Sequence, residues 1–83
     1  MIKILLFAGL ADAAGIRELN MELTNPNMTV ENIKQSLKEK YPSSAFIDVL
    51  DKSFASKNQE YVDLNTVVSK HDEVAFIPPV SGG

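Results

Sequence analysis

The chain has 83 residues, of which 45% are apolar and 23% are charged, a composition typical of one small globular domain. The absence of cysteine excludes disulfides, thiolate metal sites and a cysteine nucleophile, and a single histidine excludes a multi-histidine metal centre. Eleven acidic against eight basic residues give a net charge of −3, which argues against nucleic acid as a partner. No apolar run in the sequence is long enough to span a membrane, so none is expected to do so.

The N-terminal segment is apolar at almost every position. Residues 2–8 are therefore expected to form a central strand. The same run, with Lys3 before it and Ala11-Asp12-Ala13 after it, also resembles a short signal peptide, but its removal would delete the best strand of a small core. We favour the strand and a cytoplasmic location, with which the lack of cysteine agrees. Residues 9–15 are expected to be a loop with one helical turn around residues 11–14.

A half-exposed strand and a helix are expected next. Residues 18–23 alternate polar and apolar side chains, the strand pattern, and Asn25-Pro26-Asn27 then breaks the chain. Residues 30–40 are expected to form the clearest helix, with Thr29 as its N-cap and Pro42 after its end. Its apolar face recurs at spacings of three and four residues, at Val30, Ile33, Leu37 and Tyr41.

The second half contains shorter elements. Residues 45–50 are apolar, and their type stays open. Residues 53–57 and 60–62 are expected to pair as strands around a tight turn at Asn58-Gln59. Residues 63–68 form a connection with two or three core anchors, and residues 70–72 form a turn. Residues 73–77 are a second apolar strand, which Pro78 and Pro79 close.

This order predicts the fold class. Two apolar strands at opposite ends of the chain must be neighbours if both are central, and the helix crossover makes them parallel. We therefore expect an α+β fold, a β-grasp, with a mixed β-sheet and one main helix packed across one face. Residues 1–83 form one domain, in which residues 78–83 are an extended C-terminal tail. Ile4 and Leu6 are expected to face the helix, and Phe7 to point away from it.

Conventional catalytic groups are not expected. Ser81 could be proposed as a nucleophile with His71 as its base, but His71 lies in a polar turn with acidic neighbours. A histidine in a surface turn is far more often solvated than catalytic. Asp72-Glu73 indicates the start of a strand rather than a metal site, so we expect no bound metal. Asn27-Met28-Thr29 matches a glycosylation sequon, which has no meaning in a cytosolic protein.

The end of the chain is the distinctive feature. The last ten residues carry no charged side chain and contain half of the glycines and half of the prolines. Pro78 and Pro79 stiffen the segment, and six extended residues reach about 20 Å. Gly82 and Gly83 have no Cβ and fit a narrow tunnel in a partner. The residues expected to thread that tunnel are Pro78, Pro79, Val80, Ser81 and Gly82, and the reactive group is the C-terminal carboxylate of Gly83.

A carboxylate is a poor electrophile until ATP converts it to an acyl-adenylate, which a sulfur donor can turn into a thiocarboxylate. Residues 72–83 resemble the signature ending of the small, sulfur-carrying subunits of molybdopterin synthase, a ubiquitin-like β-grasp family. Residues 2–8, 29–31 and 58–62 support this resemblance, which covers the whole chain. The chain departs from the family at Ala11-Asp12, where an Arg-Glu pair is frequent, and at His71-Asp72, where the turn often has a glycine.

The resemblance implies a sulfur carrier that is not an enzyme on its own. A ubiquitin-activating-like enzyme would use ATP to adenylate Gly83, and a persulfide donor would give the thiocarboxylate. The large synthase subunit, in an assembly of two small and two large subunits, would use it to build the molybdopterin dithiolene from cyclic pyranopterin monophosphate. No permanently bound cofactor is implied. The partner interface is expected at Phe7, Tyr61, Phe76 and Ile77.

Two other readings stay open. The chain could carry sulfur for another product such as thiamine, although those carriers usually lack the Phe-x-Pro-Pro-Val stretch. It could also be a ubiquitin-like protein modifier or an interaction module whose tail does no sulfur chemistry.

Overall fold

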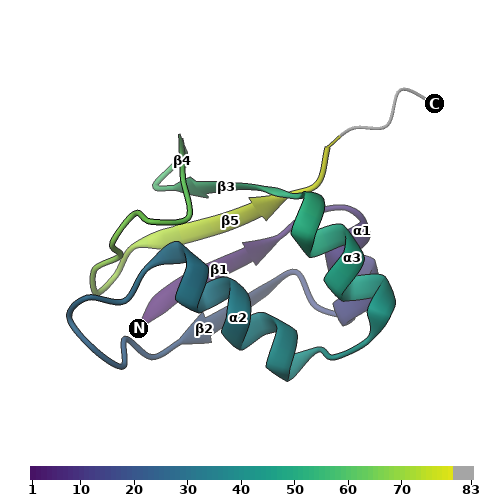
Figure 1. Cartoon of the computed structure of the whole chain (residues 1–83), viewed down its shortest axis with the longest axis horizontal. Helices are drawn as coiled ribbons and strands as arrows, with labels where there is room; N and C mark the ends of the chain where they lie inside the picture. The colour runs from purple at the N-terminus through teal and green to yellow at the C-terminus, as the bar shows by residue number, and fades with distance from the viewer. Residues whose placement is uncertain (80–83) are drawn as a thin grey trace.

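The structure is a computed structural model that describes residues 1–79 of the chain. Figure 1 shows helices packed on one face of a single sheet, with α1 and α3 at the end of the sheet where β1 and β5 end. In chain order the elements are β1 (Ile2–Leu6), α1 (Gly9–Ala14), β2 (Glu18–Met21), α2 (Val30–Lys40), α3 (Ser44–Lys52), β3 (Phe54–Lys57), β4 (Glu60–Val62) and β5 (Glu73–Ile77).

The sheet has five strands in the order β2-β1-β5-β3-β4. β1 and β5 are parallel neighbours, with Ile4 opposite Val74, and the other pairs are antiparallel. The two apolar end strands are thus adjacent and central, as the sequence predicts. The mixed sheet confirms the α+β class and the β-grasp arrangement.

Helix α2 has the bounds expected from the sequence. The Thr29 hydroxyl accepts from the Asn32 backbone N–H at 3.3 Å, and the Asn32 side chain accepts from the Thr29 backbone N–H at 3.0 Å. This capping box satisfies two backbone donors at the start of the helix. Ile33 and Leu37 are fully buried against the sheet, so the expected apolar face is confirmed.

α2 is the longest helix, as expected, and two shorter helices that the sequence does not predict pack on the same face. α3 occupies the apolar segment whose type the sequence leaves open, and its N-cap Ser43 accepts from the Phe46 backbone N–H at 3.2 Å. Phe46 and Leu50 are fully buried. α1 replaces the expected loop with a six-residue helix that buries Leu10 and ends at Gly15, whose φ is 75°. A sheet of five strands exposes more apolar surface than one eleven-residue helix can cover, which explains the extra helices.

The core lies between the helices and the inner face of the sheet. Ile2, Ile4 and Leu6 of β1 are at most 3% exposed, so the predicted orientation of Ile4 and Leu6 is confirmed. Of the connection at residues 63–68, only Val68 is buried, whereas the sequence predicts two or three anchors. Within residues 1–79, no helix is long and apolar enough to cross a membrane.

Two turns are tied together at the start of β5. Asn58 and Gln59 both have positive φ, 51° and 73°, in the turn between β3 and β4. The Asn58 side chain donates to the Asp72 carboxylate and accepts from the Glu73 backbone N–H, both at 3.0 Å. The Ser69 backbone N–H donates to the same carboxylate at 2.7 Å. The turn before β5 is therefore fixed by side-chain bonds, although His71 within it has a φ of 71°.

Candidate functional site

Side chains along β1 point alternately to the two faces of the sheet, one covered by helices and one open. Leu5 lies between the buried Ile4 and Leu6, and it points to the opposite, outer face of the sheet, as does Phe7 just after the strand. Leu5 pairs with Ala75 of β5, and Ala75 pairs with Ser56 of β3. Because paired residues lie on the same face of a sheet, these three residues share the outer face. Across the described part of the chain, this outer face has no helix on it (Figure 1).

Apolar side chains gather on this outer face near the end of β5. We call Leu5, Phe7, Phe54, Tyr61 and Ile77 the open-face patch. Phe7 is 45% exposed, Phe54 56% and Tyr61 74%. The Phe54 and Tyr61 rings meet edge to face, with centroids 6.1 Å apart, and Phe54 pairs with Ile77 across the strands. Contiguous exposed apolar surface of this kind marks an interaction site on a small protein.

Three of the four predicted interface residues lie together in this patch. Phe7, Tyr61 and Ile77 line one shallow hollow with Leu5, about 310 Å³ in volume. The expectation for Phe76 is wrong. Its side chain is 1% exposed and belongs to the core, because Phe76 pairs with Leu6 on the central strand and both face the helices.

Sequence reasoning missed Leu5 and Phe54 as patch residues. Leu5 had a usable signal, since it shares the face of Phe7 by simple strand alternation. Phe54 had a weaker one, because its face depends on the pairing of β3 with β5, which places it directly opposite Ile77.

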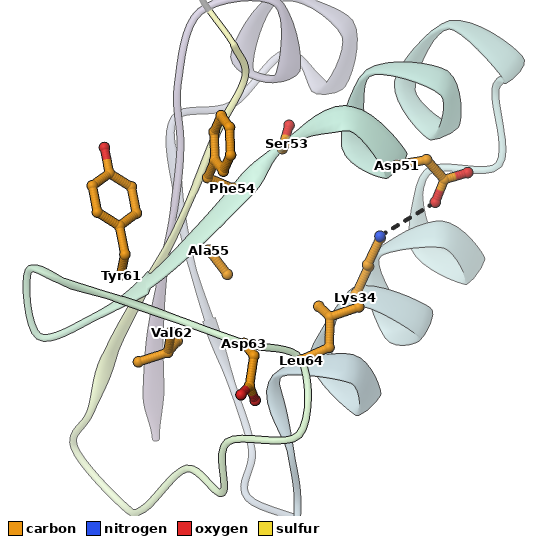
Figure 2. Close-up of a pocket in the computed structure, with 9 residues that line it drawn as sticks. All are labelled: Lys34, Asp51, Ser53, Phe54, Ala55, Tyr61, Val62, Asp63 and Leu64. Carbon is orange, nitrogen blue, oxygen red and sulfur yellow. Dashed lines mark ion pairs between the residues drawn. The ribbon is translucent and has the colours of Figure 1, made fainter.

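A second hollow lies on the other side of the β3–β4 hairpin. Figure 2 shows Phe54, Tyr61 and Val62 on the hairpin side of this pocket and Lys34 and Asp51 on its helical side. Tyr61 lines both hollows, and Phe54, which contacts the Tyr61 ring, lines the second, so the open-face patch continues around the hairpin.

Charged groups form the helical wall of that pocket. The Asp51 carboxylate accepts from Lys38 at 2.7 Å and from Lys34 at 3.4 Å, which joins α3 to α2. The hydrogen bond from Lys38 holds the pKa of Asp51 below its ordinary value. Asp51, Lys34 and Lys38 form ion pairs with one another at the surface. They link the two helices and do not form an acid–base pair.

The tail starts beside the open-face patch. Pro78 is half-buried and Pro79 is exposed, immediately after Ile77. The other predicted tail residues, Val80, Ser81, Gly82 and Gly83, lie outside the described residues. A partner that holds the end of a six-residue tail, about 20 Å long at full extension, must therefore lie close to the patch.

The remaining polar candidates do not form a catalytic group. His71 is exposed in its turn, and the carboxylate of Asp72 is engaged by Asn58 and by the Ser69 backbone. Within residues 1–79, no cluster of three or more His, Asp or Glu side chains could hold a metal ion. Among the described residues, the open-face patch is therefore the candidate functional surface.

A mixed five-strand sheet, helices on one face and a charge-free end beside an apolar patch define a ubiquitin-like β-grasp protein. A model of the ThiS family matches residues 4–83. The chain is 37% identical to the molybdopterin synthase sulfur carrier subunit of Dictyostelium discoideum, covering 98% of this chain and 94% of that one. It is 34% identical to the same subunit of Escherichia coli over the full length of both. The chain belongs to the ThiS family, among the molybdopterin synthase sulfur carrier subunits.

Solved structures agree with the β-grasp fold. The crystal structure of SAMP1 from Haloferax volcanii has a TM-score of 0.84 and 30% identity, and the match covers 99% of this chain and 98% of that one. Two more distant structures show the fold alone. One is subunit 1 in the complex of subunits 1 and 2 of the molybdopterin-converting factor from Helicobacter pylori, with a TM-score of 0.70, 19% identity and coverage of 99% and 97%. The other is a Caldiarchaeum subterraneum ubiquitin, with a TM-score of 0.63, 20% identity and coverage of 99% and 95%.

Proposed function

We propose that this chain carries sulfur on the α-carboxyl group of Gly83 and delivers it for molybdopterin synthesis. The observation that carries the proposal is the full-length match to molybdopterin synthase sulfur carrier subunits. The open-face patch beside the start of the tail supports it, because a carrier needs a surface by which partners recognise it. The chain supplies the carried group and the docking surface, and the catalytic groups belong to its partners.

The charging reaction has two stages. The Gly83 carboxylate attacks the α-phosphorus of ATP on an activating enzyme, and pyrophosphate leaves. A persulfide then attacks the acyl-adenylate, AMP leaves, and reduction of the resulting acyl disulfide by a thiol gives the thiocarboxylate. Because these steps need ATP and reduced thiols, we place them in the cytoplasm.

The delivery reaction takes place on the large synthase subunit. In each transfer the thiocarboxylate sulfur attacks a carbon of the pyranopterin precursor, the oxygen substituent of that carbon leaves, and hydrolysis of the resulting thioester restores the Gly83 carboxylate. Two such transfers supply the two sulfurs of one dithiolene. Gly82 is needed because a Cβ at that position would collide with the walls of a narrow tunnel. Pro78 and Pro79 lower the conformational entropy that is lost when the tail is held.

The open-face patch is the docking surface for the large subunit. Ile77 is in the patch and directly precedes the tail, so a partner that encloses the tail covers the patch as well. Phe7→Asp places a charge in the middle of this apolar surface and should weaken binding by more than tenfold. Asn27→Asp, in the exposed loop before α2, adds the same charge elsewhere and is the matched control.

The carboxylate claim is tested by charging the purified chain with the activating enzyme, ATP and a persulfide donor. Intact-mass spectrometry should show exchange of one oxygen for sulfur. Removal of Gly83 should abolish this mass change, and so should one additional residue after Gly83, with thermal stability unchanged in both. Gly82→Ala should slow delivery strongly without loss of stability. Normal molybdopterin formation by the untrimmed extended chain would refute the proposal.

Protein modification is a second candidate function. The observation that favours it is the similarity to SAMP1 of Haloferax volcanii, a small archaeal modifier protein, at 30% identity over nearly the whole chain. In that case the activated Gly83 would form an isopeptide bond with lysine ε-amines of other proteins. Incubation of the activated chain with a cell extract, followed by tryptic digestion and detection of the remnant of residues 71–83 on lysine, separates the two functions, because Lys70 is the last tryptic site of the chain.

A further inference from the structure

The turn that follows β1 has an unusual backbone. The Leu10 N–H donates to the Phe7 carbonyl at 3.1 Å, which closes a four-residue turn. Ala8, its second residue, has φ 51° and ψ −124°. These angles are close to those of the second residue in a type II′ turn, a position where glycine is strongly preferred. An L-residue with a side chain is strained there.

The neighbouring glycine does not relieve this strain. Gly9 follows Ala8, and its φ is not positive, so the conformation at Gly9 does not require glycine. A Cβ at Gly9 would meet Val49 Cγ1 at 3.9 Å, an ordinary van der Waals contact. The turn would therefore be more stable with glycine at residue 8 and alanine at residue 9. The chain has the reverse order, Ala8-Gly9.

The Ala8 side chain does not compensate for the strain by packing in the core. Ala8 is exposed, and it follows Phe7 of the open-face patch directly. It lines a hollow together with Leu5 and Phe7, and the charged residues Asp12, Arg17 and Glu18 also line this hollow. The methyl group of Ala8 thus extends the open-face patch by one small apolar group.

We propose that Ala8 is a contact residue for the large synthase subunit, kept in a strained conformation so that its methyl group and Phe7 meet the partner together. This inference rests on the proposed function, in which that subunit covers the open-face patch. The partner is the same because Ala8 is contiguous with Phe7, and the patch leads through Ile77 into the tail that the large subunit receives.

Ala8→Gly tests the inference because it moves stability and binding in opposite directions. Glycine removes the strain, so the Tm should rise by roughly 4–8 °C. Loss of one buried methyl and the added backbone freedom should weaken the affinity for the large subunit by about five- to tenfold. His71→Gly is the control, because it relieves the same kind of strain in the turn before β5, at the opposite end of that strand from Ile77. It should raise the Tm and leave the affinity unchanged.

The measurements are thermal unfolding of each variant and calorimetric titration of the full chain into the purified large subunit. A raised Tm with unchanged affinity for Ala8→Gly would overturn the inference, and so would a Tm that does not rise. Phe7→Asp, titrated in parallel, separates the two proposals. If it weakens binding and Ala8→Gly does not, only the role of Ala8 is refuted. If neither variant weakens binding, the docking surface itself is refuted.

Discussion

Leu37→Ala measures how much the helix α2 contributes to a fold this small. Leu37 is fully buried in the core, and its truncation removes three carbon atoms. At about 0.8 kcal/mol for each buried methylene, the lost transfer free energy is roughly 2.4 kcal/mol, and the residual cavity raises the total to about 2–5 kcal/mol. A chain of 83 residues has a free energy of unfolding of about 4–12 kcal/mol, so this one change removes a large share.

Urea unfolding followed by circular dichroism gives the free energy of unfolding for the wild type and the variant, with the m-value as a check on the unfolded state. Val67→Ala is the control, because Val67 is 46% exposed and its truncation should cost less than about 1 kcal/mol. The reasoning is refuted if Leu37→Ala and the equivalent Ile33→Ala each cost less than about 0.5 kcal/mol, since neither residue would then face the sheet.

The remaining predictions concern the turns at the start of β5. Gln59→Gly should raise the Tm by roughly 4 °C, since φ at this position is 73°, and an unchanged Tm would contradict the strain argument. Burial raises the pKa of Asp72, but hydrogen bonds from Asn58 and the Ser69 backbone outweigh burial and leave the pKa below its ordinary value. A lowered folded-state pKa stabilises the protein fully above about pH 5, and this stabilisation is lost as the pH falls through the folded pKa. Asp72→Asn should therefore flatten the fall of the urea midpoint below pH 5 relative to the wild type, and an equally steep fall in both would contradict the pKa argument.

Strong periodic signals predicted the parts of the fold that depend on local sequence. Helix α2 was predictable because an N-cap, a spaced apolar face and a terminal proline agree with one another. Helix α3 was not, since a six-residue apolar segment fits a strand as well as a helix. The sequence signal that could have identified it as a helix is Ser43, an N-cap whose side chain accepts from the backbone N–H of Phe46, three residues later.

The site was predictable only in part, because β1 and β5 are both apolar at four of their five positions. In β1 the charged Lys3 marks the outer face, and Phe7, four residues later, points outward as predicted. In β5 the adjacent Phe76 and Ile77 are both apolar, and hydrophobicity alone does not show which of them faces outward. The pairing of β5 with β1 decides this, and it places Phe76 inside and Ile77 in the patch. Backbone strain at Ala8 likewise depends on how the turn closes, which no residue pattern in this segment indicates.

Transfer of the sulfur itself is the most direct test of the account. The chain is charged with isotopically labelled sulfur, freed of unbound sulfide, and mixed with the large subunit and the pyranopterin precursor for a single turnover. We predict that the label enters the dithiolene of molybdopterin and that the intact mass of the chain returns to that of the free carboxylate at Gly83. If the label stays on the chain while molybdopterin forms with unlabelled sulfur added to the solution, the chain is not the sulfur donor and the central claim is wrong.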